Sequence, residues 1–258
     1  MTNINTYLLE LSEKLKFSSD MKEKIDASIE YFKQKFWGHF QDRLNDVIVF
    51  GSYSRGTIIS KDDLADVDIV AIYKSKEFQP DTYLKQIRNF CENIYPRTKI
   101  YQDHPTIVID MEQIKFEIVP SYFISTDIVK IPAPHNREIK WVNTNPSLLI
   151  NKVVNKDKNN KNLIIPVIRI LKYWNILNKR PFSSFQIENA IISKLFNCST
   201  LKEYYVSSIS AIEEIANNEI QKKAIMNLKN KQKRLRILES NDLHEYIEQE
   251  FSSFLPIP

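Results

Sequence analysis

The chain has 258 residues, 43% of them hydrophobic and 26% charged, with a formal net charge of +4 at pH 7, which fits a globular protein and excludes an intrinsically disordered one. No window holds the ~18 uncharged apolar residues that a membrane span needs. Two cysteines make no disulfide framework or zinc pattern, and three glycines exclude the GxGxxG and Walker A phosphate loops.

The N-terminal segment predicts two amphipathic helices. Apolar residues recur with helical spacing over 4–15 and again over 21–36. Asp20 and Glu23 resemble a capping box at the start of the second helix. The segment carries acids among its leucines and no small-residue cleavage site, so we expect no secretion signal and a cytoplasmic protein.

A strand-rich segment follows these helices. The apolar run at 47–50 stops at Gly51 and predicts a strand that ends in a turn. Residues 66–73 alternate acids with valine and isoleucine and predict a second strand, and residues 80–94 predict a helix.

Two further β-rich runs lie at 106–110 and 114–123. We expect the second run to end near Pro120, because proline cannot donate a hydrogen bond to a strand ladder. The polar stretch 155–162 predicts a loop. Helices are expected over 164–177, 184–195, 200–216, 219–238 and 241–251.

This order of elements predicts an α+β fold in which a small mixed sheet with flanking helices precedes a helical lobe. We expect the division near residue 140, with residues 1–140 forming the sheet-containing core and residues 141–258 the helical lobe. A cleft between the two lobes is the expected place for an active site.

The positive charge is concentrated in two stripes. Residues 152–180 contain eight Lys or Arg and one acid, and residues 220–238 contain seven and no acid. Such stripes attract phosphates, but Lys-rich faces are also common on solvated helices. Both interpretations stay open for the second stripe.

Asp66 and Asp68 carry the strongest chemical signal. Side chains alternate across a strand, so both carboxylates project from one face, ~7 Å apart. Carboxylates this close repel each other unless a cation lies between them. Oxygen-only ligands favour a hard ion such as Mg²⁺ or Mn²⁺, and two such ions ~3.5–4 Å apart suit phosphoryl or nucleotidyl transfer.

A third carboxylate would complete a two-metal site. Glu117 is the best candidate, because Lys115, Glu117 and Val119 share the face opposite the apolar side of their strand. Asp110, on the preceding run, is the fallback. Gly51 and Ser52 lie where a strand ends, so a missing Cβ, exposed amides and a hydroxyl would suit phosphate oxygens.

Taken together, these motifs resemble the polymerase-β-like nucleotidyltransferases. The pattern is most similar to the bacterial cGAS/DncV-like enzymes, also called CD-NTases, with SMODS domains. The matching segments are GSYSRGT (51–57), DVD (66–68), FEIVP (116–120), RILKYWN (169–175) and SSFQIE (183–188).

The resemblance implies a nucleotidyltransferase palm followed by a helical lobe that completes the nucleotide pocket. It implies that Asp66, Asp68 and Glu117 bind two Mg²⁺ ions and that Ser52 contacts the triphosphate. One departure is that the third carboxylate is usually Asp in this family and is Glu117 here.

From the helical lobe, the resemblance implies three further contacts. Lys172 matches a lysine that reaches the distal phosphates, Ser184 a serine that hydrogen-bonds a phosphate, and Phe185 an aromatic residue on which the base stacks. Without the resemblance, Lys172 would be solvated and Phe185 a core residue. Trp174 is expected in the core, facing the sheet.

The resemblance also implies a template-independent enzyme that joins ATP or other NTPs into a cyclic or linear oligonucleotide. In bacterial members that product is a second messenger that activates an effector in CBASS-like defence against phage. Two alternatives stay open: an enzyme that extends an RNA 3′ end such as that of tRNA, held by the basic stripes, and a catalytically weak nucleotide or RNA sensor with the same fold.

Overall fold

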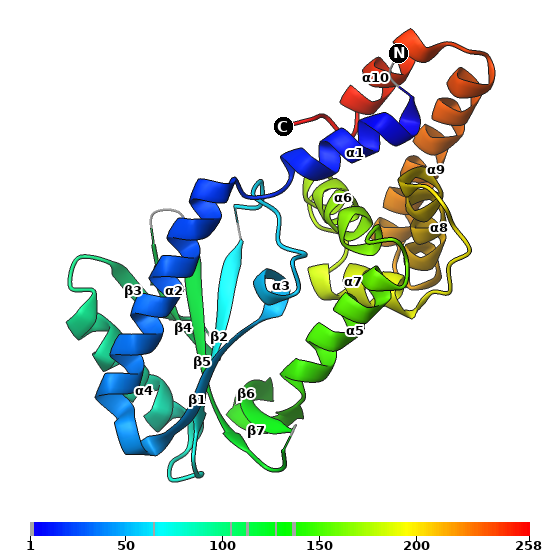
Figure 1. Ribbon diagram of the computed structural model, residues 1–258. Helices are drawn as coiled ribbons and strands as arrows, with labels where there is room; N and C mark the ends of the chain where they lie inside the picture. Colours follow the sequence, from blue (N-terminus) through cyan, green and yellow to red (C-terminus); the bar gives the residue numbers. More distant parts are fainter. Residues whose placement is uncertain (1–2, 64, 104, 112–113, 127, 136–137) are drawn as a thin grey trace. The chain divides into compact units, whose positions relative to one another are not determined.

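The computed structural model describes residues 3–63, 65–103, 105–111, 114–126, 128–135 and 138–258 (Figure 1). The chain divides into two compact units. Residues 18–56 and 64–151 make up the sheet unit, and residues 1–17, 57–63 and 152–258 make up the helical unit.

This division differs from the one expected near residue 140. The first helix and the short segment 57–63 group with the helical unit, and the sheet unit continues to residue 151. The reason is packing: Leu8, Leu11 and Ile59 are fully buried in the same apolar cluster as the helices of the second half.

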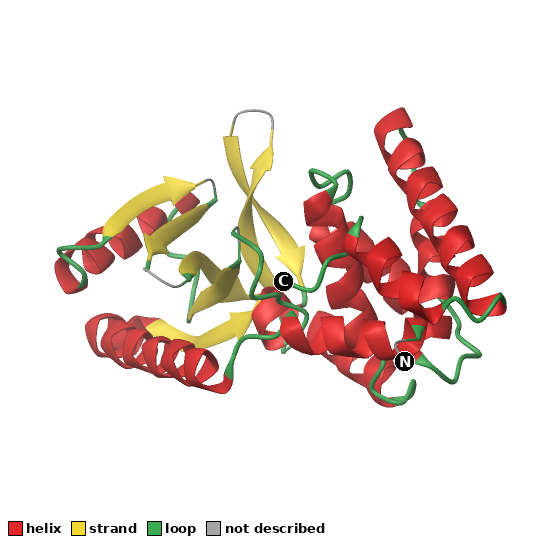
Figure 2. Cartoon of the chain, turned by 90° about the horizontal axis from the view of Figure 1, so that it is seen from above, coloured by secondary structure: helices red, strands yellow, loops and turns green. Residues whose placement is uncertain are grey.

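The sheet unit contains all the strands that the structure describes (Figure 2). They are ordered β1-β2-β5-β4-β3, with β6 beside the end of β5 and β7 beside β6. Among the described strands, β2 and β5 are the one pair that runs parallel. The elements are α2 (Ser19–Phe40), β1 (Leu44–Phe50), α3 (Gly51–Ser54), β2 (Asp66–Tyr73), α4 (Pro80–Ile94), β3 (Lys99–Asp103), β4 (Thr106–Asp110), β5 (Lys115–Phe123), β6 (Val129–His135) and β7 (Glu138–Thr144).

One face of the sheet is covered by α2 and α4. Phe32 of α2 meets Phe90 of α4 and Phe116 of β5, with ring centroids 6.2 Å apart in each pair. The alternation of β2 sends Val67 and Ile69 to the interior at 0% exposure. The acids of β2 therefore project from the opposite face.

The prediction that a strand ends near Pro120 is wrong. β5 continues to Phe123 through the proline. Pairing with β4 stops at Ile118 and pairing with β6 begins at Tyr122, so Pro120 lies in a gap on that side where no amide donor is needed.

Three strands were not predicted: β3, β6 and β7. β6 contains Pro132 and Pro134, residues that argue against a strand by sequence pattern. It pairs along its length with β7 and with β5 only at Tyr122 and Phe123, so prolines are tolerated on its open side.

The helical unit confirms the helices expected in the second half. α5 (Pro146–Lys158) connects the two units, and the unit itself contains α1 (Ile4–Lys14), α6 (Ile164–Leu177), α7 (Ser184–Ser193), α8 (Leu201–Glu214), α9 (Glu219–Ser240) and α10 (His244–Ser252). The loop expected over 155–162 is partly wrong, because α5 extends through Lys158.

The ends of the chain meet inside the helical unit. Tyr7 of α1 stacks on Phe251 of α10 with ring centroids 4.2 Å apart, and its hydroxyl donates to the carbonyl of Leu255 at 2.9 Å. Trp174 is buried as predicted, and its ring lies 6.4 Å from that of Phe182 in the core of the helical unit.

Helix caps were predicted with mixed success. The capping box expected at Asp20 and Glu23 is not the N-cap of α2. The N-cap is Ser18, whose hydroxyl accepts a hydrogen bond from the amide of Met21. Ser183 caps α7 in a capping box with Gln186, as its sequence suggests. Within the described residues, no helix is long and apolar enough to cross a membrane.

Candidate active site

The turn after β1 is built against a carboxylate of β2. Gly51, the first residue of α3, has φ +73°, and a Cβ placed on it would lie 1.6 Å from Oδ2 of Asp68. Only glycine satisfies both the backbone conformation and the space. The predicted strand-to-turn junction and the predicted metal-binding acid are therefore in direct contact.

Asp66, Asp68 and Glu117 share one face of the sheet, as the sequence predicts. Asp68 on β2 lies opposite Glu117 on β5 in the parallel register, and Asp66 lies two residues before Asp68 on the same face. Val67 and Phe116, at the alternate positions, are fully buried on the other face.

The surroundings of Glu117 disfavour the charged form of its carboxyl group. The pKa of Glu117 is raised from 4.5 to about 7, first by burial and then by the nearby charges of Asp66 and Asp103, against the lowering effects of Lys115 and Thr106. Burial and the neighbouring carboxylates therefore disfavour the charged form of Glu117.

The chemistry of this face fits a hard divalent cation. All three candidate ligands are carboxylates, and a cation between them would favour their charged forms. Among the residues that the structure describes, no three His, Cys, Asp or Glu side chains already form a group ready to hold a metal ion. The three acids share this face of the sheet.

The short helix α3, which carries Gly51 and Ser52, is braced by α2. The hydroxyl of Tyr53 donates to Oδ1 of Asp26 at 2.6 Å, and Lys22 lies 2.6 Å from the other oxygen of that carboxylate. Burial and the charge of Asp26 raise the pKa of Tyr53 well above its usual range. The phenol therefore stays protonated and anchors the turn.

Lys172 is buried, so the interpretation of it as a solvated surface lysine is wrong. It is 3% exposed in the helical unit, where its ammonium donates to the carbonyl of Thr57 at 3.0 Å and lies 3.5 Å from Oε1 of Glu188. The hydroxyl of Thr57 donates to the same oxygen of Glu188 at 2.5 Å.

Thr57 and Glu188 were given no role by the sequence patterns, although both lie inside the matching motifs 51–57 and 183–188. One sequence does not show which positions of a motif are conserved. The only sign in the sequence that Thr57 and Glu188 matter was therefore their place inside those two segments. Their structural role follows from the contacts that join them to each other and to Lys172.

Ser184 and Phe185 begin α7. Ser184 is half-buried at the first position of the helix, where backbone amides lack internal partners. Phe185 is 55% exposed, so the core interpretation is wrong for it. An exposed phenyl ring beside a helix N-terminus is a suitable platform for a planar ring next to a phosphate.

The predicted site residues therefore fall into two groups, each ordered within its own unit. The sheet unit holds Gly51, Ser52, Asp66, Asp68 and Glu117 around the β1–α3 turn and the β2–β5 pair. The helical unit holds Lys172, Ser184 and Phe185, and the contact of Lys172 with Glu188 joins α6 to α7.

A family model described as "Second Messenger Oligonucleotide or Dinucleotide Synthetase domain", SMODS, matches residues 1–159, more than half of the chain. The chain belongs to the SMODS family. It is therefore a nucleotidyltransferase of the oligonucleotide-synthetase type, and the predicted family and α+β fold class are confirmed.

Solved structures give the same fold for this SMODS chain. It is similar to the E. coli MS115-1 CdnC in a CdnC:HORMA-deltaN complex, with a TM-score of 0.78, 13% identity and coverage of 98% of this chain and 97% of that one. It is also similar to Bradyrhizobium diazoefficiens CdnG in complex with GTP, with a TM-score of 0.76, 12% identity and 96% of each chain covered.

Vibrio cholerae DncV, a cyclic AMP-GMP synthase, is similar over 82% of this chain and 68% of its own, with a TM-score of 0.67 and 12% identity. Identities this low show a shared fold and no more. A search of the curated proteins finds no match.

Proposed function

We propose that this SMODS chain joins nucleoside triphosphates, ATP among them, into a cyclic or linear oligonucleotide without a template. The observation that carries the proposal is the contact between Gly51 and the carboxylate of Asp68, with Glu117 beside Asp68 in register. A phosphate-suited turn and an acidic face are thereby built next to each other in one unit.

Asp66, Asp68 and Glu117 would hold two Mg²⁺ or Mn²⁺ ions on this face. Such ions, when bound, lower the pKa of an attacking hydroxyl and neutralise the pyrophosphate leaving group. The raised pKa of Glu117 supports this assignment, because a carboxyl surrounded by other acids gains most from a cation. Gly51 and Ser52 would present backbone amides and a hydroxyl to the triphosphate.

The helical unit would supply Lys172, Ser184 and Phe185 to the nucleotide. The exposure of Phe185 supports a stacking role, and the start of α7 supports phosphate contact by Ser184. Lys172 is buried against Glu188 and Thr57, so a contact with phosphate would require it to exchange one of these partners.

The product would be a second messenger that activates a separate effector, in a CBASS-like defence of bacterial cytoplasm against phage. The similar structures include E. coli MS115-1 CdnC with ATP, B. diazoefficiens CdnG with GTP and a CdnC complex with a HORMA partner. These observations support nucleotide substrates and signalling assemblies for this fold.

The test is incubation of the purified chain with labelled NTPs and Mg²⁺ or Mn²⁺, followed by phosphatase treatment and mass spectrometry. A phosphatase-resistant small oligonucleotide is the expected result. Label transferred to added tRNA or another RNA would instead support extension of an RNA 3′ end. No turnover with any NTP would support a nucleotide or RNA sensor.

A further inference from the structure

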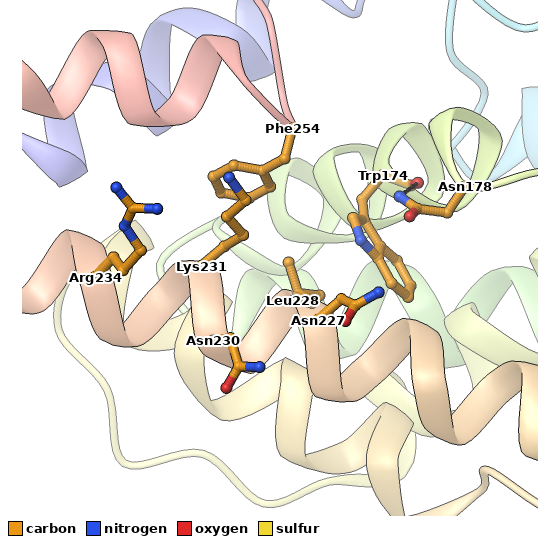
Figure 3. A pocket seen from close by; sticks show the side chains of 8 residues that line it. All are labelled: Trp174, Asn178, Asn227, Leu228, Asn230, Lys231, Arg234 and Phe254. Atoms are coloured by element: carbon orange, nitrogen blue, oxygen red, sulfur yellow. Dashed lines mark hydrogen bonds between the residues drawn. The ribbon is translucent and has the colours of Figure 1, made fainter.

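The helical unit contains a pocket of about 370 Å³ that involves none of the residues assigned to catalysis (Figure 3). Its volume lies within the range of ~300–1,000 Å³ that is usual for small-molecule sites. α9 forms one side, and residues from the end of α6 and from the segment after α10 complete it.

The floor and wall of this pocket are apolar and rigid. Leu228 of α9 is 1% exposed, and Trp174 of α6 is 2% exposed because the rest of its ring is held in the core. Phe254 is stacked on the buried Phe251 with ring centroids 5.6 Å apart. The ammonium of Lys231 lies over the ring of Phe254, 5.8 Å from its centroid, so a planar ligand ring would lie on the apolar floor beside Phe254 rather than on its face.

Polar groups occupy the two ends of the pocket. Figure 3 shows Asn178 and Asn227 near Trp174, and Lys231 and Arg234 farther along α9. The amide nitrogen of Asn178 donates to the carbonyl of Trp174 at 2.8 Å. The carboxamide of Asn227 has no hydrogen-bond partner among the described residues, so it is available to a ligand.

The cationic end carries more positive than negative charge. Lys231 and Arg234 share the single carboxylate of Glu250, at 3.1 and 3.3 Å. The side chain of Glu250 is 9% exposed, whereas that of Arg234 is 68% exposed. Two cations therefore pair with the nearly buried carboxylate of Glu250, and the guanidinium of Arg234 has N–H donors that face solvent.

The spacing of these groups along α9 sets the shape of the ligand. Asn227, Lys231 and Arg234 are four and three residues apart, so they lie on one face of the helix, spread over about 10 Å. A carboxamide can pair with the edge of a nucleobase, and a guanidinium can bind a phosphate through two hydrogen bonds.

We propose that this pocket is a second nucleotide-binding site, separate from the catalytic residues. The base lies over the apolar floor at the Trp174 end of the pocket and is read by Asn227, and the phosphate lies at Lys231 and Arg234. Binding at this site needs no divalent cation, because its counter-charges are protein side chains.

The test is calorimetric titration with AMP in EDTA, alongside adenosine and inorganic phosphate as separate probes. Wild-type protein is expected to bind one AMP, more tightly than either probe alone. Arg234→Glu should weaken AMP binding roughly tenfold or more, the size expected for a charge-assisted hydrogen bond. Lys233→Glu, the same charge change on an exposed neighbour outside the pocket, should leave it within about twofold.

Two further variants locate the binding. Asn227→Leu should weaken AMP without changing the affinity for inorganic phosphate, because it removes only the contact with the base. Phe185→Ala should leave AMP binding unchanged. The proposal is overturned if AMP does not bind, if phosphate alone binds as tightly as AMP, or if Phe185→Ala removes the binding and Arg234→Glu does not.

Two variants distinguish a failure of the second nucleotide site from a failure of the proposed function. Asp68→Asn should lose turnover and keep AMP binding in EDTA, whereas Arg234→Glu should lose that binding and keep turnover. Wild-type protein that makes no oligonucleotide but shows Arg234-dependent AMP binding contradicts only the proposed function. Turnover without Arg234-dependent binding contradicts only the second site.

Discussion

Lys172 and Glu188 form an ion pair inside the helical unit, 3.5 Å apart and with both side chains 4% exposed. Thr57 completes the arrangement by accepting from Lys172 through its carbonyl and donating to Glu188 through its hydroxyl. The segment that follows the Gly51–Gly56 turn is thereby fastened to α6 and α7. Arg180 adds a second attachment through Asp62 and Asp63, at 2.6 and 2.9 Å.

The first prediction concerns this pair. Lys172→Met should lower the free energy of unfolding by about 3–5 kcal/mol, because it leaves a buried carboxylate without its cation. The double variant Lys172→Met, Glu188→Leu should be more stable than Lys172→Met alone. Urea denaturation of the two single variants and the double variant measures the coupling. Strictly additive losses would contradict a direct ion pair.

The second prediction concerns Gly51. Gly51→Ala should lower the free energy of unfolding by about 1–3 kcal/mol and reduce turnover, because the new methyl group meets Asp68 at a positive φ. Gly38→Ala is the matched control. Nothing lies within 4 Å of a Cβ at Gly38 inside α2, so that variant should gain about 0.5–1 kcal/mol. Equal effects of both substitutions on turnover and stability would argue against the close contact.

The third prediction concerns the pH dependence of stability without metal. The folded pKa of Glu117 is about 7 and its ordinary value is 4.5, so the folded protein keeps a proton that the unfolded chain has lost between these values. The free energy of unfolding should therefore fall as the pH rises from about 4.5 to 7. In EDTA at pH 8, Glu117→Gln should be more stable than wild type by about 1–2 kcal/mol, a figure reduced for partial solvent screening.

Thermal and urea unfolding of wild type and Glu117→Gln at pH 5 and pH 8 measures this difference. The variant should show the smaller change between the two pH values. If its stability stays below that of wild type at pH 8, the carboxylate is compensated by protein groups, and the case for a cation on this face weakens.

The fourth prediction concerns the acids of β2. Asp66→Asn and Asp68→Asn should each abolish nucleotidyl transfer while leaving thermal stability unchanged or higher, because each relieves repulsion between like charges. Asp110→Asn tests the fallback ligand. Asp110 lies opposite Lys115 rather than Glu117, so its variant should keep most of the turnover. Retained activity in both Asp66→Asn and Asp68→Asn would exclude their proposed role.

The fifth prediction concerns Phe185. Phe185→Ala should weaken NTP binding by about 1–3 kcal/mol through lost stacking, with little change in stability because the ring is 55% exposed. Tyr in place of Phe185 should restore the affinity. Nucleotide affinity equal to that of wild type, measured by titration with ATP and Mg²⁺, would remove Phe185 from the nucleotide site.

Local patterns in the sequence determined much of this protein. The alternation at Asp66 and Asp68 fixes which side chains share a face, because a strand has a two-residue period whatever surrounds it. The same holds for the helical spacing of α6 to α10 and for the capping box at Ser183, which depend on contacts within a few residues.

Tertiary structure decided what depends on partners far apart in the chain. Lys172 is buried because Thr57, 115 residues away, and Glu188 satisfy its charge, and no local pattern contains that information. Pro120 is tolerated in β5 because the pairing of β5 with β4 stops at Ile118 and its pairing with β6 begins at Tyr122. Strand register and burial are set by long-range packing, whereas the period of a side-chain pattern is set by the backbone alone.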